Sequence, residues 1–260
     1  MTQSGEHILN ILASEDASSA LRNMHIEGTL SVVLPEVSAL DIQAIGHKNN
    51  FDHTMKVLDN ACAVSKDPWF RLAALLHDIG KAKARRQNEN KEWTFYAHEI
   101  IGSEMLSVIW QRLGFPQDKY DMVECITRWH GQAKNLGEIA NDSAIRRFYN
   151  DTEKFFEELI LFCKCDMTTK FREKIEKQRK QLEDLRIRTY ELKKADEEAK
   201  YRIPFDGHWL MQQVDERPGP WLKETMEEVK RAIKSGELLD EEEVAKDYAI
   251  NILKVKGLIK

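Results

Sequence analysis

Prolines and glycines are scarce in this sequence, which has 6 and 12 of them among 260 residues. Because these residues supply many tight turns, their scarcity argues against an all-β fold made of short strands. Alternating β-branched stretches are also rare, and the one strand-like run, residues 31–37, contains a proline that disfavours a central strand. Apolar residues recur instead three and four positions apart, for example over 106–114 and 155–166. The sequence therefore predicts an all-α protein.

Cysteines are few, and long apolar runs and an excess of basic residues are missing. The four cysteines form no C-x-x-C pair, which favours reduced, buried thiols over a disulfide framework or a zinc knuckle. No apolar run approaches the roughly 20 residues of a membrane span, and no basic-then-apolar start marks a secretory signal. The net charge of -5 excludes an overall basic surface for nucleic acid, although a local basic patch stays open. We expect a soluble, cytoplasmic protein without membrane contact.

The chain divides into three segments of different character. Residues 1–45 read as short helices that lead into the main body, and residues 46–170 carry most of the histidines. Residues 171–260 begin with a dense run of charge and end in a small helical tail. We expect a neck-like segment, a domain that carries the chemistry, and a long helix followed by a tail.

The charged run has a sparse apolar stripe, typical of a helix that packs along one narrow side. We favour this interpretation over a coiled-coil dimer seam, and the oligomeric state stays open. For the last helix of the tail, Asp240 is the expected N-cap, with acidic residues in the first turn. The tail helices are expected near 207–214, 220–235 and 240–254.

The strongest local signal is a His-Asp pair at the end of a helix of nearly continuous apolar composition. His77 and Asp78 follow Leu72–Leu76, and Gly80 and Lys81 come directly after them. Burying an ionised carboxylate costs several kcal/mol unless something compensates it. A divalent cation bound by the adjacent nitrogen and oxygen provides that compensation. Lys81 is then placed to meet a phosphate.

Four further residues could complete a metal site, because each lies at the edge of an apolar run. We expect them at helix ends, pointing inward toward one cationic centre. They are His53, His98, His130 and Asp166. His47 is a weaker candidate for lining the site.

Each of these residues also has an ordinary structural interpretation. The His77–Asp78 pair could be a helix-end salt bridge, and His98 and His130 could be hydrogen-bonded helix-terminal histidines. Asp166 could cap the following segment through Thr168 or Thr169. For the isolated His7, His25 and His208 we prefer the structural interpretation, as we do for Trp129, which is more often a core residue than a base-stacking platform.

The order His, His-Asp, Asp resembles the HD superfamily of metal-dependent phosphohydrolases. The resemblance implies a helical bundle in which His53, His77, Asp78 and Asp166 bind a first metal ion. Members with two metals add histidines between the doublet and the last aspartate, which here are His98 and His130, and Asp78 would then bridge the two ions.

A second resemblance covers almost the whole chain. In order, its motifs are similar to the neck, HD and tail regions of bacterial CCA-adding tRNA nucleotidyltransferases, of the poly(A) polymerase family. The motifs are LASEDASSALRNMHIEGTLSVVLPEVSAL, FDHTMKVLD, AALLHDIGK, WTFYAHEIIGSEM, SAIRRFYND and PGPWLKETMEEVKRAIKSGEL. The glycine-rich turn and Asp-x-Asp pair of that family's nucleotidyltransferase head do not occur, so we expect no nucleotide addition by these 260 residues. Whether the chain is free-standing or a fragment stays open.

The resemblance implies a phosphodiesterase or phosphatase acting on nucleotide or RNA-end phosphoesters, such as 2′,3′-cyclic phosphates and 2′-nucleotides. One or two divalent ions would activate water, and the mixed ligands suit Mn, Fe, Co, Ni or Zn better than Mg, which is left open. Asp78 and Lys81 are the expected catalytic residues, and the expected substrate-binding residues are Lys81, Arg85, Arg146 and Arg147. A salt bridge is an equal alternative for the last two. Two other functions stay open: a nucleotidase or cyclic-dinucleotide phosphodiesterase, and a non-catalytic tRNA- or RNA-binding module.

Overall fold

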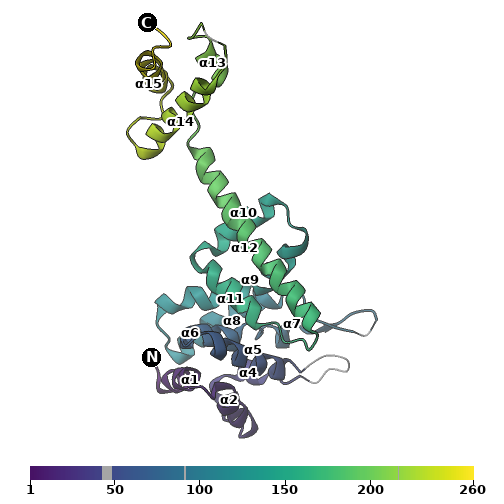
Figure 1. The fold of residues 1–260 in the computed structure, drawn as a ribbon. Coiled ribbons are helices and arrows are strands. Elements are labelled where there is room, and N and C mark those ends of the chain that lie inside the picture. Colours follow the sequence, from purple (N-terminus) through teal and green to yellow (C-terminus); the bar gives the residue numbers. More distant parts are fainter. Residues whose placement is uncertain (43–48, 91, 216) are drawn as a thin grey trace. The chain divides into compact units, whose positions relative to one another are not determined.

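The structure is a computed structural model that describes residues 1–42, 49–90, 92–215 and 217–260 (Figure 1). The chain divides into two compact units, Met1–Thr189 and Tyr190–Lys260. Helix α12 (Arg172–Lys200) contributes residues to both units. The predicted boundaries after residues 45 and 170 stay predictions.

Helices dominate the described residues of the first unit, which confirms the predicted all-α class. Besides α12, its elements are α1 (Gln3–Ala13), α2 (Ala17–Ile26), α3 (Thr29–Val33), α4 (Pro35–Ser38), α5 (Asn50–Val64), α6 (Pro68–Leu76), α7 (Lys81–Ala84), β1 (Arg86–Gln87), β2 (Trp93–Thr94), α8 (His98–Leu113), η1 (Gln117–Lys119), α9 (Tyr120–Ile139), α10 (Asp142–Thr152), η2 (Glu153–Phe155) and α11 (Phe156–Cys165).

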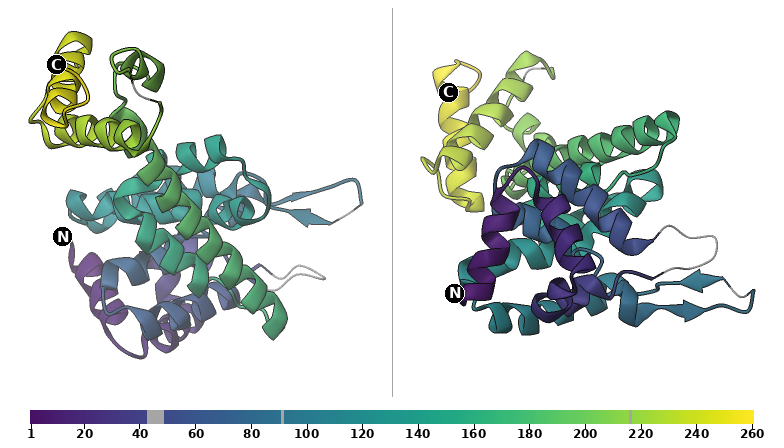
Figure 2. Two further views of the ribbon diagram at one scale, coloured as in Figure 1. Left: turned by 45° about the horizontal axis from the view of Figure 1, so that its top comes forward. Right: turned by 90° about the horizontal axis from the view of Figure 1, so that it is seen from below.

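The two strands among the described residues lie where no strand was predicted. The strand-like run 31–37 forms the end of α3 and most of α4, because Pro35 occupies the first turn of α4, where its missing N–H costs nothing. β1 and β2 pair instead as a short antiparallel ladder, with Arg86 opposite Thr94 and Gln87 opposite Trp93. Figure 2 shows this pair standing away from the helices of the first unit.

Helix α6 lies at the centre of the first unit. Asp67 caps it by accepting a hydrogen bond from the Trp69 amide, Pro68 starts it, and its residues from Phe70 to Leu76 are all buried. It packs against α1, α5 and α9. This surrounding core fixes the C-terminal end of α6, where the His-Asp pair begins.

Arg71 is a buried charged residue within α6, and its exposed fraction is 3%. Its guanidinium donates hydrogen bonds to the carbonyl oxygens of Leu12 at 2.7 Å, Ser14 at 2.8 Å and Ser65 at 2.8 Å. Backbone carbonyls therefore stabilise this cation, and two of them belong to the N-terminal segment around α1.

The second unit has its own apolar core. Its helices are α13 (Gly207–Met211), α14 (Pro220–Ser235) and α15 (Glu242–Val255), close to the three tail helices predicted. They bury Leu210, Val229, Ala249 and Leu253.

One detail of the tail prediction is wrong: Glu241, and not Asp240, occupies the N-cap position of α15. The extended backbone that precedes the helix falls at Glu241, and no side-chain hydrogen bond caps the helix. The acidic first turn is present, with Glu242 and Glu243. Among the described residues, no helix is both long and apolar enough to cross a membrane.

Candidate metal centre

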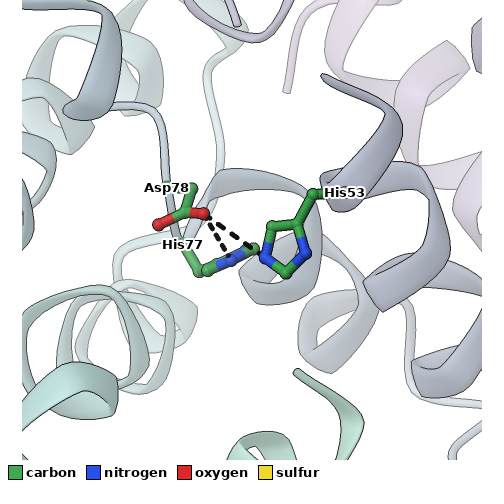
Figure 3. Close-up of side chains that lie close together, drawn as sticks. All are labelled: His53, His77 and Asp78. Carbon is green, nitrogen blue, oxygen red and sulfur yellow. Dashed lines mark ion pairs between the residues drawn. The ribbon is translucent and has the colours of Figure 1, made fainter. Parts of the chain in front are cut away.

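The first unit brings together all six predicted ligand residues. They form three overlapping groups, His53–His77–Asp78, His77–His130–Asp166 and Asp78–His98–His130, and within each group the candidate ligand atoms lie within 4.8 Å of one another. Figure 3 shows His53 and His77 directed toward the Asp78 carboxylate.

Helix ends position most of these side chains. His53 lies in the first turn of α5, which Asn49 caps, and His77 is the C-cap of α6. His98 begins α8, and Asp166 is the C-cap of α11. The expectation that every ligand lies at a helix end is wrong for His130, which lies inside α9. Because that helix packs against α6, α8 and α11, an interior position also faces the centre.

The two oxygens of Asp78 face two different sets of nitrogen atoms. Oδ2 lies 3.1 Å from His77 Nε2, 3.5 Å from His53 Nε2 and 2.6 Å from Lys81 Nζ. Oδ1 lies 3.2 Å from His98 Nε2 and 3.7 Å from His130 Nε2. The carboxylate therefore lies between two histidine pairs, the arrangement expected of a ligand shared by two ions.

Asp166 joins the first of these sets. Its Oδ1 lies 2.9 Å from His53 Nε2 and 3.8 Å from His77 Nε2. Its Oδ2 accepts a hydrogen bond from Lys134 Nζ. Asp166 was also a candidate cap for the following segment. Its carboxylate instead faces His53 and His77. Thr168 instead bonds His53 Nδ1 at 2.9 Å.

The remaining ring nitrogens determine which nitrogen of each histidine faces the centre. Nδ1 of His77 lies 2.8 Å from the Ala74 carbonyl oxygen, and Nδ1 of His98 lies 2.9 Å from that of Phe95. Nδ1 of His130 lies 3.1 Å from the Thr127 carbonyl oxygen. Because a carbonyl can only accept, these contacts place a proton on Nδ1, so Nε2 is the ring nitrogen that faces the centre and that would bind a metal.

Electrostatics keep the two aspartates ionised although both are buried. Burial alone would raise the pKa of Asp78, but His77 and Lys81 outweigh it and hold that pKa well below its usual value. Burial likewise opposes ionisation of Asp166, but Lys134 and His53 lower its pKa far below the ordinary range. The pKa of His130 is lowered, mainly by burial, which favours the neutral imidazole. Ionised carboxylates and a neutral imidazole are the forms that bind metal.

Two buried atoms at this centre lack a hydrogen-bond partner among the described residues: His77 Nε2 and Asp78 Oδ1. An unsatisfied buried polar atom costs about 1–3 kcal/mol, and more if it is charged. A cation within the cluster would remove that cost for both atoms. The side chains present therefore fit one or two divalent ions, with nitrogen from the histidines and oxygen from the aspartates.

The predicted phosphate-binding residues differ in their positions. Lys81 lies at the centre, bonded to Asp78, and its side chain is 19% exposed. Arg85 is stacked on Trp93, with its Cζ 3.7 Å from the ring centroid. Arg146 and Arg147 lie on α10, and their role in binding RNA stays a prediction. His47 lies outside the described residues.

Sequence reasoning missed two charged residues of this site, Lys134 and Glu99. Lys134 lies one helical turn after His130 and therefore on the same face of α9, a spacing that could have revealed it. Glu99 Oε2 lies 3.1 Å from His98 Nδ1. Its carboxylate fits over Gly131, where a Cβ would overlap Oε1 and lie 3.2 Å from Cδ. Glu99 and the Phe95 carbonyl both contact His98 Nδ1 and therefore together hold the imidazole in its orientation.

We expect Glu99→Gln to weaken binding of the second ion at His98 about tenfold, the lower part of the range for outer-shell partners, because the Phe95 carbonyl remains. The neutral amide makes the imidazole a weaker donor. Titration calorimetry with Mn²⁺ would measure the loss, with Glu104→Gln, an exposed position of the same helix, as the control. Equal affinities for wild type and Glu99→Gln would show that Glu99 does not support metal binding at His98.

A helical unit with a buried His-Asp doublet, converging histidines and a distant aspartate defines a protein of the HD class. The chain matches the HD domain family over residues 50–196, more than half of its length, and it belongs to this family.

The curated relatives that the chain resembles are bacterial proteins named multifunctional CCA protein. The one from Nitrosococcus oceani is 29% identical over 150 residues, or 54% of this chain and 36% of that protein. The one from Legionella pneumophila is 26% identical over 147 residues, or 53% and 35%. The one from Neisseria meningitidis is 31% identical over 123 residues, or 45% and 29%. The matched segment thus spans about a third of the length of these relatives, in agreement with the predicted likeness to an HD region.

Proposed function

We propose that this protein is a metal-dependent phosphohydrolase. The observation that carries the proposal is the position of the buried Asp78 carboxylate, with one oxygen toward His53 and His77 and the other toward His98 and His130. Such a shared carboxylate suits a pair of divalent ions, and Mn, Fe, Co, Ni or Zn suit the mixed nitrogen and oxygen donors better than Mg.

When bound, such ions would neutralise phosphoryl charge and lower the pKa of water, so that hydroxide is available as the nucleophile near neutral pH. The protein's own groups would hold and orient the substrate. Lys81 and Lys134 each pair with one of the two aspartates, and their side chains are 19% and 30% exposed. Their ammonium groups contact the buried aspartates while the side chains are partly open to solvent, so they could meet the phosphoryl oxygens of an arriving ester.

For the substrate we propose a nucleotide or RNA-end phosphoester of the 2′,3′-cyclic phosphate or 2′-nucleotide type. The likeness to proteins named multifunctional CCA protein supports an RNA-related ester, with tRNA among the candidate partners. The cationic residues Lys81 and Lys134, whose ammonium groups contact the two aspartates of the centre, support an anionic substrate.

The test is turnover after defined metal loading. Protein stripped with a chelator should be inactive, and addition of Mn²⁺ or Ni²⁺ should restore hydrolysis of 2′,3′-cyclic AMP and of bis-(p-nitrophenyl) phosphate. Metal analysis of the same samples would show whether activity follows the amount of bound ion. A loaded protein that hydrolyses neither ester nor any nucleotide in a panel would contradict the proposal and favour the binding-module alternative.

A further inference from the structure

Three aromatic residues lie between the His-Asp doublet and His98, in the segment that begins with β2 and leads into α8. They are Trp93, Phe95 and Tyr96. The first ring is covered by Arg85, and the second lies 6.0 Å from Lys81 Nζ. Tyr96 is different, because the residue is 83% exposed and no ring or cation contact is found for it among the described residues.

The backbone on either side of Tyr96 is fixed. Ala97 has φ 60° and ψ 22°, a left-handed conformation that is unfavourable for a residue with a Cβ. The His98 amide donates to the Phe95 carbonyl oxygen at 3.2 Å, which closes the turn around Tyr96. The exposure of Tyr96 therefore results from a specific, strained turn and not from a loose loop.

This turn belongs to the metal centre. The Phe95 carbonyl that closes it also accepts from His98 Nδ1. Because consecutive Cα atoms are 3.8 Å apart, the Tyr96 Cα lies within about 8 Å of the His98 Cα.

We propose that Tyr96 is a stacking platform for the base of a nucleotide whose phosphoryl group lies at the metal centre. The inference rests on the proposed function and deepens it, because it assigns the site to nucleotidyl esters and not to phosphoesters in general. Stacking of a base on an aromatic ring is sequence-tolerant, since every base has a π face. The cationic centre and the exposed ring thus divide the ligand between them, one binding the phosphoryl group and the other the base.

The experiment compares Tyr96→Ala and Tyr96→Phe with wild type, all in the full chain and loaded with Mn²⁺. Calorimetry would measure binding of a non-hydrolysable phosphonate analogue of adenosine 2′-monophosphate and of inorganic phosphate, which has no base. For Tyr96→Ala we expect roughly 10- to 100-fold weaker binding of the nucleotide, with phosphate affinity and metal content unchanged. Tyr96→Phe, which keeps the ring, should bind the nucleotide like wild type.

Three results would overturn the inference. The first is nucleotide binding by Tyr96→Ala at wild-type affinity. The second is an equal loss of nucleotide and phosphate binding in that variant, which would mean that Tyr96 acts through His98. The third is a wild type that binds the nucleotide no better than phosphate, or binds neither. Turnover decides the proposed function separately, since a protein that binds the nucleotide through Tyr96 but hydrolyses no ester contradicts that proposal alone.

Discussion

Replacing Asp78 by alanine is expected to remove most of the bound metal and to lower ester hydrolysis by about 1,000-fold or more. Asp78 contacts all four histidines of the cluster. Its loss therefore removes a candidate ligand from the His53–His77 pair and from the His98–His130 pair. Metal ions contribute several kcal/mol of transition-state stabilisation, and about 4 kcal/mol corresponds to that factor. Elemental analysis and turnover of 2′,3′-cyclic AMP would measure the two effects.

The control for this variant is Asp52→Ala. Asp52 lies next to His53 in α5, but its carboxylate pairs with Arg22 at 2.5 Å and is 57% exposed. We expect it to keep its metal and its activity, and both variants to keep their helical circular dichroism. If Asp78→Ala bound metal at the wild-type stoichiometry, the ligand assignment would be wrong.

Gly80→Ala should destabilise the protein by about 1–3 kcal/mol and weaken metal binding at the same time. A Cβ at residue 80 would overlap the His98 carbonyl oxygen and lie 2.6 Å from the Gly102 amide nitrogen. Both neighbours are backbone atoms of α8, so a rotamer change cannot relieve the clash. The start of α8 would have to move, and His98 would move away from Asp78 with it.

Urea unfolding of the apo protein and a Mn²⁺ titration would measure the two effects of Gly80→Ala. Gly207→Ala is a matched control, because a Cβ there would meet only the Leu222 side chain at ordinary distances of 3.8 and 3.9 Å. Wild-type stability and affinity in Gly80→Ala would show that α8 can shift without disturbing the centre.

The sequence predicted the all-α class and the six residues that the structure brings together. It could do so because polar residues such as Asp78 and Asp166 follow runs of apolar residues, where an unpaired carboxylate would be costly. That His53 would meet Asp166 could not be read from either segment alone, since the two lie on different helices; their positions at the edges of apolar runs suggested a common centre, and the resemblance implied the same ligand set. Their role as metal ligands stays a prediction.

The missed features have no comparable local signal. Glu99 is one of several charged residues in its helix, and only packing shows that it faces the cluster. Lys134 has the weaker signal of its spacing from His130, which places both residues on one face of α9. β1 and β2 are each two residues long, too short for an alternating pattern to be seen. The left-handed Ala97 is invisible in sequence because alanine normally favours the opposite, helical region.

The hydrogen bonds of Arg71 set the N-terminal limit of a functional fragment. The family match begins at residue 50, yet this cation in α6 depends on the carbonyls of Leu12 and Ser14. A fragment that begins at residue 50 would lack the Leu12 and Ser14 carbonyls. The Arg71 guanidinium would then lose two of its hydrogen-bond acceptors inside α6, the helix whose C-cap is His77. We therefore expect that a stable fragment carrying the six candidate ligand residues has to begin well upstream of residue 50, at or before α1.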